Sequence, residues 1–236
     1  MVSIYIFKVE GLKKEYLKYL KDYTHINENE DEFGIELRQY VTNLNCPEKN
    51  LVNFTFRHES VTKILIGNKN LPNFHVDTAN VWFSFKQKPT YLFIESSSNL
   101  DFIKSEIRRI IQIQLPLENM VDLVINEINL RDYFTEIIKE DASEVLSSWF
   151  QGLNTNDHSI TLRGLLKDDE GVESEYYRKI NETAKTQTSV TIRSKKVVNK
   201  ITIGKNKISS QNKEVNLETL IDYFEKVILK LLENNN

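Results

Sequence analysis

Short runs of alternating apolar and polar residues predict β-strands along much of the chain. Residues 2–10, VSIYIFKVE, alternate with a period of two, and residues 51–60 place Val52, Phe54 and Phe56 on one face. A period of two is typical of a strand with one buried face. Further strands of this kind are predicted at residues 61–66, 80–85, 90–96, 159–167, 189–193 and 198–209.

Other segments have the period of an amphipathic helix. Residues 99–115 repeat isoleucine at helical spacing, at Ile103, Ile107, Ile110 and Ile111. The clearest helix is predicted over residues 216–232, where the apolar stripe includes Leu220, Ile221, Phe224, Val227 and Ile228. Shorter helices are expected within residues 11–23 and 170–186.

Residues 117–151 contain neither glycine nor proline, and they predict a continuous helical segment that Gly152 ends. The fold class that follows is α+β. We expect two antiparallel β-rich halves with packed helices, joined by an all-helical connector. The predicted division is residues 1–116, a connector at 117–152, and residues 153–236.

A short sequence repeat suggests that the two halves are related. Residues 61–67, VTKILIG, and 198–204, VNKITIG, are identical at five of seven positions. We interpret each as a hairpin strand with isoleucines facing inward and a glycine, Gly67 or Gly204, at a positive φ angle. The alternative is chance similarity, because these residue types are common in the chain.

The composition is that of a soluble globular protein. Of 236 residues, 40% are hydrophobic and 28% are charged. The longest apolar runs, such as residues 4–7, have four residues, whereas a membrane helix needs about 20. We therefore expect no membrane segment and, with no signal pattern at the amino terminus, a cytoplasmic location. Cys46 is the single cysteine, which excludes an internal disulfide.

Charge is distributed unevenly along the sequence. The net charge is −3, yet residues 176–213 hold ten Lys and Arg and one acid, Glu182, a local sum of +9. Such a segment attracts polyanions. We therefore predict a nucleic-acid surface on the second hairpin, with phosphate contacts from Arg193, Lys195, Lys196, Lys200, Lys205 and Lys207.

In this prediction Lys205 and Lys207 project from the hairpin tip, and Tyr176 and Tyr177 stack on bases. Two plainer interpretations remain open. Lysines commonly protect an exposed strand edge. The basic segment could also pair with the acidic stretch Glu28–Glu32 of the same chain or of a neighbour.

Signatures of catalysis are missing from the sequence. Gly204-Lys205 lacks the upstream glycine of a phosphate-binding loop, and no dinucleotide-binding glycine pattern occurs. One cysteine and four dispersed histidines do not fit a structural zinc site. Cys46 shows no activating partner, and Arg57-His58 on a strand is more typical of a structural pair than of an RNA-cleaving one. We expect no metal and no cofactor.

The function that the sequence favours is a non-catalytic nucleic-acid-binding or assembly protein. The alternative is a protein-binding subunit or homo-oligomer, held through exposed strand edges or an aromatic ridge of Trp149, Phe150 and Leu153. A metal-dependent nuclease or another enzyme ranks third.

Overall fold

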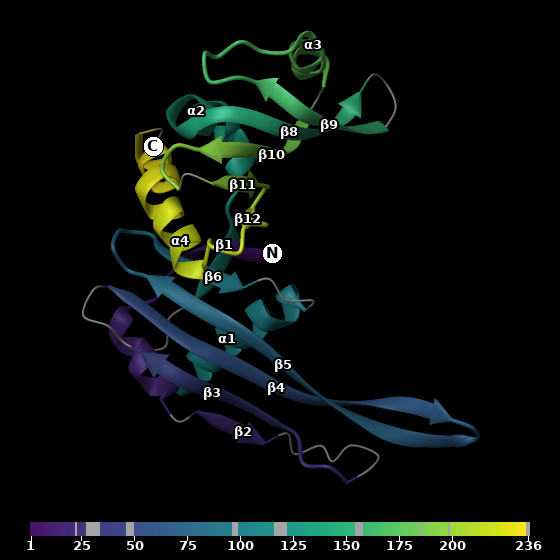
Figure 1. Cartoon of the computed structure of the whole chain (residues 1–236). Helices are drawn as coiled ribbons and strands as arrows, with labels where there is room; N and C mark the ends of the chain where they lie inside the picture. Colours follow the sequence, from purple (N-terminus) through teal and green to yellow (C-terminus); the bar gives the residue numbers. More distant parts are fainter. Residues whose placement is uncertain are drawn as a thin grey trace. The chain divides into compact units, whose positions relative to one another are not determined.

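The structure, a computed structural model of the chain (Figure 1), describes residues 1–21, 23–26, 34–45, 50–95, 99–115, 122–153, 158–184, 186–197 and 199–234. Within these residues helices and antiparallel strands are mixed and strands predominate, so the α+β prediction is confirmed. The chain forms two compact units, Phe7–Asn126 and Met1–Ile6 with Glu127–Asn236. It passes between them within strands β1 (Val2–Glu10) and β7 (Val124–Glu127).

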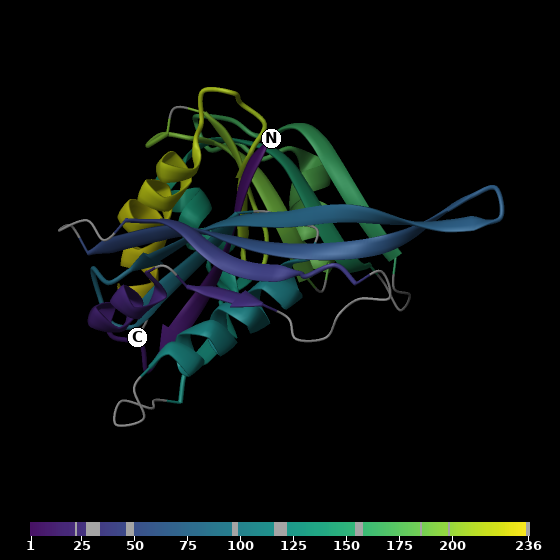
Figure 2. The same cartoon turned by 90° about the horizontal axis from the view of Figure 1, so that it is seen from below.

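The unit Phe7–Asn126 has an antiparallel sheet with the order β2-β3-β4-β5-β6. Its strands are β2 (Thr24–Ile26), β3 (Arg38–Asn45), β4 (Leu51–Ile66), β5 (Lys69–Ser84) and β6 (Thr90–Glu95). Helix α1 (Leu100–Gln114) lies against one face of this sheet, beside the 3-10 helix η1 (Lys14–Leu20) (Figure 2). Both predicted apolar faces are buried: Val52, Phe54 and Phe56 on β4, and Ile103, Ile107, Ile110 and Ile111 on α1.

Strands β4 and β5 pair along their whole length and extend beyond their neighbours. Pairing with β3 ends at His58, and pairing with β6 begins at Val81. The remaining ribbon, residues 59–76, projects from the unit (Figures 1 and 2), and we call it the arm. Gly67 turns its tip with a φ angle of 61°, as predicted. Its isoleucines do not face inward, because Ile64 and Ile66 are 42% and 61% exposed.

The unit Met1–Ile6 with Glu127–Asn236 has an antiparallel sheet with the order β9-β8-β10-β11-β12, followed by the first residues of β1. Its other strands are β8 (Ala142–Leu153), β9 (His158–Lys167), β10 (Thr186–Ser194), β11 (Lys200–Ile203) and β12 (Lys207–Ser210). Its helical elements are η3 (Leu130–Tyr133), α2 (Phe134–Asp141), α3 (Glu175–Thr183), α4 (Leu217–Tyr223), the π-helical turn η4 (Phe224–Ile228) and α5 (Leu229–Asn234).

One face of this second sheet forms the core with the helices. Its buried strand residues include Ile4, Val145, Phe150, Val190, Ile192, Ile201, Ile203 and Ile208. Helix α2 contacts β8, β10 and η4, and the predicted apolar stripe of the last helix is buried at Leu220, Ile221, Phe224, Val227 and Ile228. The π-helical turn within that stripe does not interrupt it.

The all-helical connector is wrong, because residues 142–153 form strand β8 between β9 and β10. Ser147 pairs with Thr191, and Val145 pairs with the adjacent Ile192, so β8 has one extra residue at this point. Such a bulge shifts the alternation of buried side chains by one position. The apolar residues around it then fall at helical spacing although the segment is a strand. Residue 116, the first predicted boundary, lies outside the described residues.

The second hairpin, β11–β12, differs from the tip of the arm. Ile201 and Ile203 are fully buried, and Gly204 does not lie in the left-handed region of φ. Backbone bonds hold the hairpin turn: Ile6 N donates to the Asn206 carbonyl at 2.8 Å, and Leu130 N donates to the Lys205 carbonyl at 2.6 Å. Val198 lies outside the described residues, and the internal duplication stays a prediction.

Candidate nucleic-acid interface

The sheet of the unit 127–236 has a second face, which carries polar and basic side chains. Arg193 pairs with Lys200 and Thr191 with Thr202, while the intervening pair, Ile192 and Ile201, points into the core. Because successive side chains of a strand point to opposite faces, the first two pairs lie on the face away from the helices. The same alternation places further residues on this face, which we call the open face. It includes Ser3, Tyr5, Glu144, Ser147, Trp149, Thr161, Arg163, Ser189, Thr191, Arg193, Lys200, Thr202, Lys207 and Ser209.

A groove of about 640 Å³ lies on the open face. Three cations line it, Arg163 from β9, Arg193 from β10 and Lys200 from β11, together with the amides of Asn199, Gln211 and Asn212. The hydroxyls of Thr191 and Thr202 lie between them and are 2.8 Å apart. Guanidinium, ammonium, amide and hydroxyl groups are the groups with which proteins bind phosphate and sugar oxygens.

The charge of the open face is positive. It carries Arg163, Arg193, Lys200 and Lys207 against one carboxylate, Glu144, so the net charge of these described residues is 4 − 1 = +3. Arg193 Nε donates to Glu144 Oε2 at 2.7 Å, but the two side chains are 46% and 28% exposed. Solvent screens such a pair, and Arg193 can exchange Glu144 for a phosphate at a cost of about 1 kcal/mol or less.

Of the six residues predicted to contact phosphates, three lie on the open face. Arg193 and Lys200 are cross-strand partners, and Lys207 lies at the other end, with its ammonium 4.8 Å from the centre of the Tyr5 ring. Lys205 does not project from a free tip: its ammonium donates to Glu127 Oε2 at 2.7 Å.

The other two residues of this prediction, Lys195 and Lys196, lie in a turn whose backbone is hydrogen-bonded to the buried Asp141. Lys195 N donates to the carbonyl of Asp141 at 2.8 Å, and Lys196 N donates to its Oδ1 at 3.0 Å. Lys196 lines a separate cavity of about 350 Å³ with Tyr223 and Lys226. The structure therefore does not bring Lys196 to the groove of the open face.

Sequence reasoning missed Arg163 and the position of Trp149. The position of Arg163 on the open face follows from the alternation of residues 159–167 once β9 is paired with β8. In this pairing Arg163 lies opposite Ser147. Trp149 is 41% exposed, whereas its neighbour Phe150 is 1% exposed, so these two side chains do not form a common ridge. Tyr177 is buried against Phe150, and burial raises the pKa of its hydroxyl. Tyr177 therefore cannot stack on a base.

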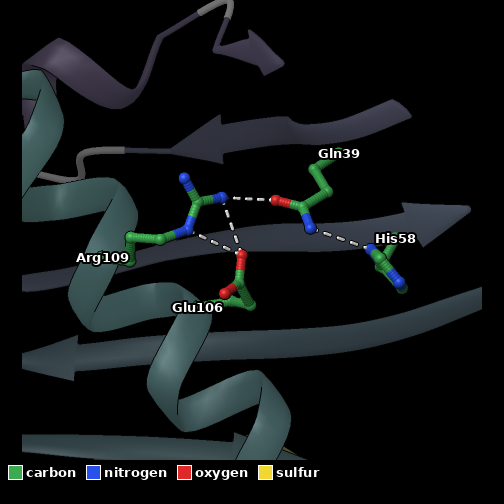
Figure 3. A network of polar contacts seen from close by, with 4 residues as sticks. All are labelled: Gln39, His58, Glu106 and Arg109. Carbon is green, nitrogen blue, oxygen red and sulfur yellow. Dashed lines mark hydrogen bonds and ion pairs between the residues drawn. The ribbon is translucent and has the colours of Figure 1, made fainter. Parts of the chain in front are cut away.

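A second polar cluster lies in the unit Phe7–Asn126, between α1 and the strands β3 and β4 (Figure 3). The guanidinium of Arg109 donates to Glu106 Oε2 from Nε at 3.0 Å and from Nη2 at 2.7 Å. Nη2 also donates to Gln39 Oε1 at 2.6 Å, and Gln39 Nε2 lies 3.1 Å from His58 Nδ1. Since Gln39 accepts through its oxygen, its amide group must donate to His58, which makes Nδ1 the unprotonated ring nitrogen.

The electrostatics of this cluster fit a structural role. The hydrogen bond to Glu106 raises the pKa of Arg109, and burial lowers the pKa of His58. A permanently charged guanidinium and a neutral imidazole connect the helix to two strands. The four residues drawn in Figure 3 include no Ser, Thr, Cys or Lys side chain. Cys46 and the acidic stretch Glu28–Glu32 lie outside the described residues.

Neither a metal centre nor a membrane span is found in the part of the chain that the structure describes. No three His, Cys, Asp or Glu side chains gather there as ligands for a metal ion. No helix there has the length and apolar character needed to cross a bilayer.

The candidate site rests on the geometry of the open face. It combines convergent cations, a groove and an exposed tryptophan on one side of one sheet. No protein-family model matches the chain, and no curated protein matches its sequence.

Proposed function

We propose that the unit 127–236 binds nucleic acid through its open face without a catalytic step. The observation that supports this proposal is the convergence of Arg163, Arg193 and Lys200, from three different strands, on one groove. Cations that converge on one groove can neutralise neighbouring phosphates and release their counterions. Cations scattered over the surface would only add to the net charge.

The proposed contacts are to the nucleic-acid backbone. Arg163 and Arg193 present planar guanidinium groups that can bind phosphate oxygens in pairs, and Lys200 acts as a point charge. Lys200 and Lys207 lie on strands that pair, displaced by about four residues, so their Cα atoms are about 14 Å apart. The surface therefore extends over several nucleotides.

The experiment is a binding titration with a fluorescently labelled oligonucleotide, compared between the wild-type chain and the double variant Arg163→Glu/Lys200→Glu. We expect the variant to lose at least 50-fold in affinity, because two attractive contacts become repulsive. The matched control is Lys230→Glu, an exposed cation of α5 on the helical side, and it should bind like wild type. Equal binding by the wild-type chain and the double variant would refute the proposal.

A second candidate function is self-association through the arm. Leu65 and Phe74, from opposite strands of the arm, are 68% and 50% exposed, and both strand edges of residues 59–76 lack a β-partner among the described strands. Exposed apolar surface and free edges are typical of sites where proteins associate. Light scattering after size exclusion tests this candidate. A wild-type dimer that the double variant Leu65→Lys/Phe74→Lys converts into a monomer would support it. A wild-type chain that stays monomeric at a protein concentration 100-fold above its Kd for nucleic acid would exclude it.

A further inference from the structure

We infer that the ligand of the open face is single-stranded nucleic acid, and that Trp149 stacks on one of its bases. This inference rests on the function proposed above and adds the class of nucleic acid to it. Trp149 lies close to the cations of the groove, and a single strand has unpaired bases that a duplex does not offer.

Trp149 lies on the open face, on the strand next to the edge strand β9. It belongs to β8, and its cross-strand partners are Thr161 on β9 and Ser189 on β10, both small side chains. The residues on either side of it, Ser148 and Phe150, are 1% exposed and point into the core. The indole therefore points away from the helices, and 41% of the residue remains exposed. Tryptophan side chains usually bury most of their surface in a core or an interface. An indole that stays exposed between small neighbours therefore offers its ring to a planar ligand.

The position of the indole matches that of the groove. Ser147, two residues before Trp149, lines the groove and pairs with Arg163. Arg163 is thus a diagonal neighbour of Trp149, with Cα atoms about 7–8 Å apart, within reach of a long side chain. A base stacked on the indole would place its own phosphate beside Arg163. The strand could then continue along the groove toward Arg193 and Lys200.

Tyr5, the other aromatic residue of the open face, is less suited to stacking. The Lys207 ammonium lies 4.8 Å from the centre of its ring and 3.5 Å from its hydroxyl oxygen. A cation already occupies the position that a base would take. The structure therefore assigns the stacking contact to Trp149 and a phosphate contact to Lys207.

Only unpaired bases can stack on the exposed indole of Trp149. In a duplex the flat faces of the bases are covered by the neighbouring base pairs, so Trp149 contributes nothing and the cations alone bind. In a single strand each base can leave its neighbours and stack on an aromatic side chain. Stacking is worth about 1–3 kcal/mol per base, which corresponds to about 5- to 160-fold in affinity.

The test compares a labelled 20-nucleotide single strand with the duplex of the same sequence, at one salt concentration, for wild type, Trp149→Ala and Trp149→Phe. We expect the single strand to bind at least fivefold more tightly than the duplex. Trp149→Ala should lose this advantage while duplex binding stays unchanged, and Trp149→Phe should keep most of it. A second readout uses Trp82→Phe, which leaves Trp149 as the single tryptophan. Its fluorescence should be quenched by the single strand but not by the duplex.

The outcomes separate this inference from the proposed function. If strand and duplex bind equally, and neither Trp149→Ala nor the quenching distinguishes them, the inference is overturned and the nucleic-acid function stands. If neither nucleic acid binds to the wild-type chain, the proposed function fails and the inference fails with it. If Trp149→Ala does not fold, the quenching of the Trp82→Phe protein decides alone.

Discussion

The polar cluster of Figure 3 gives a stability prediction for the substitution Arg109→Met. It removes the donors to Glu106, whose side chain is 13% exposed, and to Gln39, which is 5% exposed. Hydrogen bonds to charged groups contribute about 1.5–3 kcal/mol, and the acceptors left behind have little access to water. Because 34% of the Arg109 side chain is exposed, solvent screening lowers the expected cost to about 2 kcal/mol of the free energy of unfolding.

The assay is urea unfolding followed by fluorescence in a Trp149→Phe background. Trp82 is then the single tryptophan, and it is 7% exposed within the unit Phe7–Asn126, so it reports on this unit. With an m value of about 2 kcal/mol/M, Arg109→Met should lower the midpoint by about 1 M urea.

The matched control for this prediction is Arg108→Met on the same helix. Arg108 forms an ion pair with Asp122 at 3.5 Å, and the side chains are 49% and 84% exposed. Exposed pairs contribute about 0–1 kcal/mol, so this variant should unfold within about 0.5 M of wild type. Equal midpoints for the two variants would refute the structural role of the Arg109 network.

Two further predictions test other parts of the structure. Burial lowers the folded-state pKa of His58 below that of the unfolded chain, so stability should be complete above about pH 6.5 and fall as the pH drops below it. The urea midpoint should fall less with decreasing pH in His58→Gln, because glutamine cannot take up the proton. An equal fall in wild type and His58→Gln would contradict a role for His58 in this pH dependence. Gly67→Ala should cost about 1 kcal/mol, because φ is 61°, whereas Gly204→Ala should be tolerated, since its Cβ would meet nothing closer than 3.9 Å. Equal thermal shifts for the two alanine variants would show that the two turns do not differ in backbone conformation.

The helices with uninterrupted spacing were predictable from the sequence. The four isoleucines of α1 and the central stripe of the last helix are buried as expected. In both segments the local period and the buried face agree, so the sequence pattern alone is sufficient. The same agreement holds for Val52, Phe54 and Phe56 in the proximal half of β4.

Strand β8 and the arm show where local pattern is insufficient. The extra residue of β8 near Val145 gives the strand an apolar pattern with helical spacing. Only its pairing with β9 and β10 identifies the segment as a strand. The repeat VTKILIG and VNKITIG carries nearly the same letters, yet Ile66 is 61% exposed on the arm and Ile203 is fully buried. The difference lies in the tertiary structure: helices cover one face of β11, whereas no helix of the described residues covers the arm.

The candidate site was partly predictable for the same reason. The charge excess pointed to Arg193 and Lys200, but a linear count of cations cannot tell which share a face. Arg163 and Trp149 lie outside the basic segment 176–213 and join the open face through strand pairing. The Arg109 network joins residues separated by 70 positions in the sequence, which no local pattern could have indicated.

The most direct test of the central claim is the salt dependence of single-strand binding, measured for wild type and for the neutralised variant Arg163→Gln/Lys200→Gln. With three or four phosphates bound, log K should fall with log salt concentration at a slope of about −2 to −3. Removing two cations should make the slope about 1.4 shallower and weaken binding about 25-fold at 0.1 M salt. A wild-type slope near zero, or the same slope for both proteins, would contradict the claim that the cations of the open face bind phosphates together.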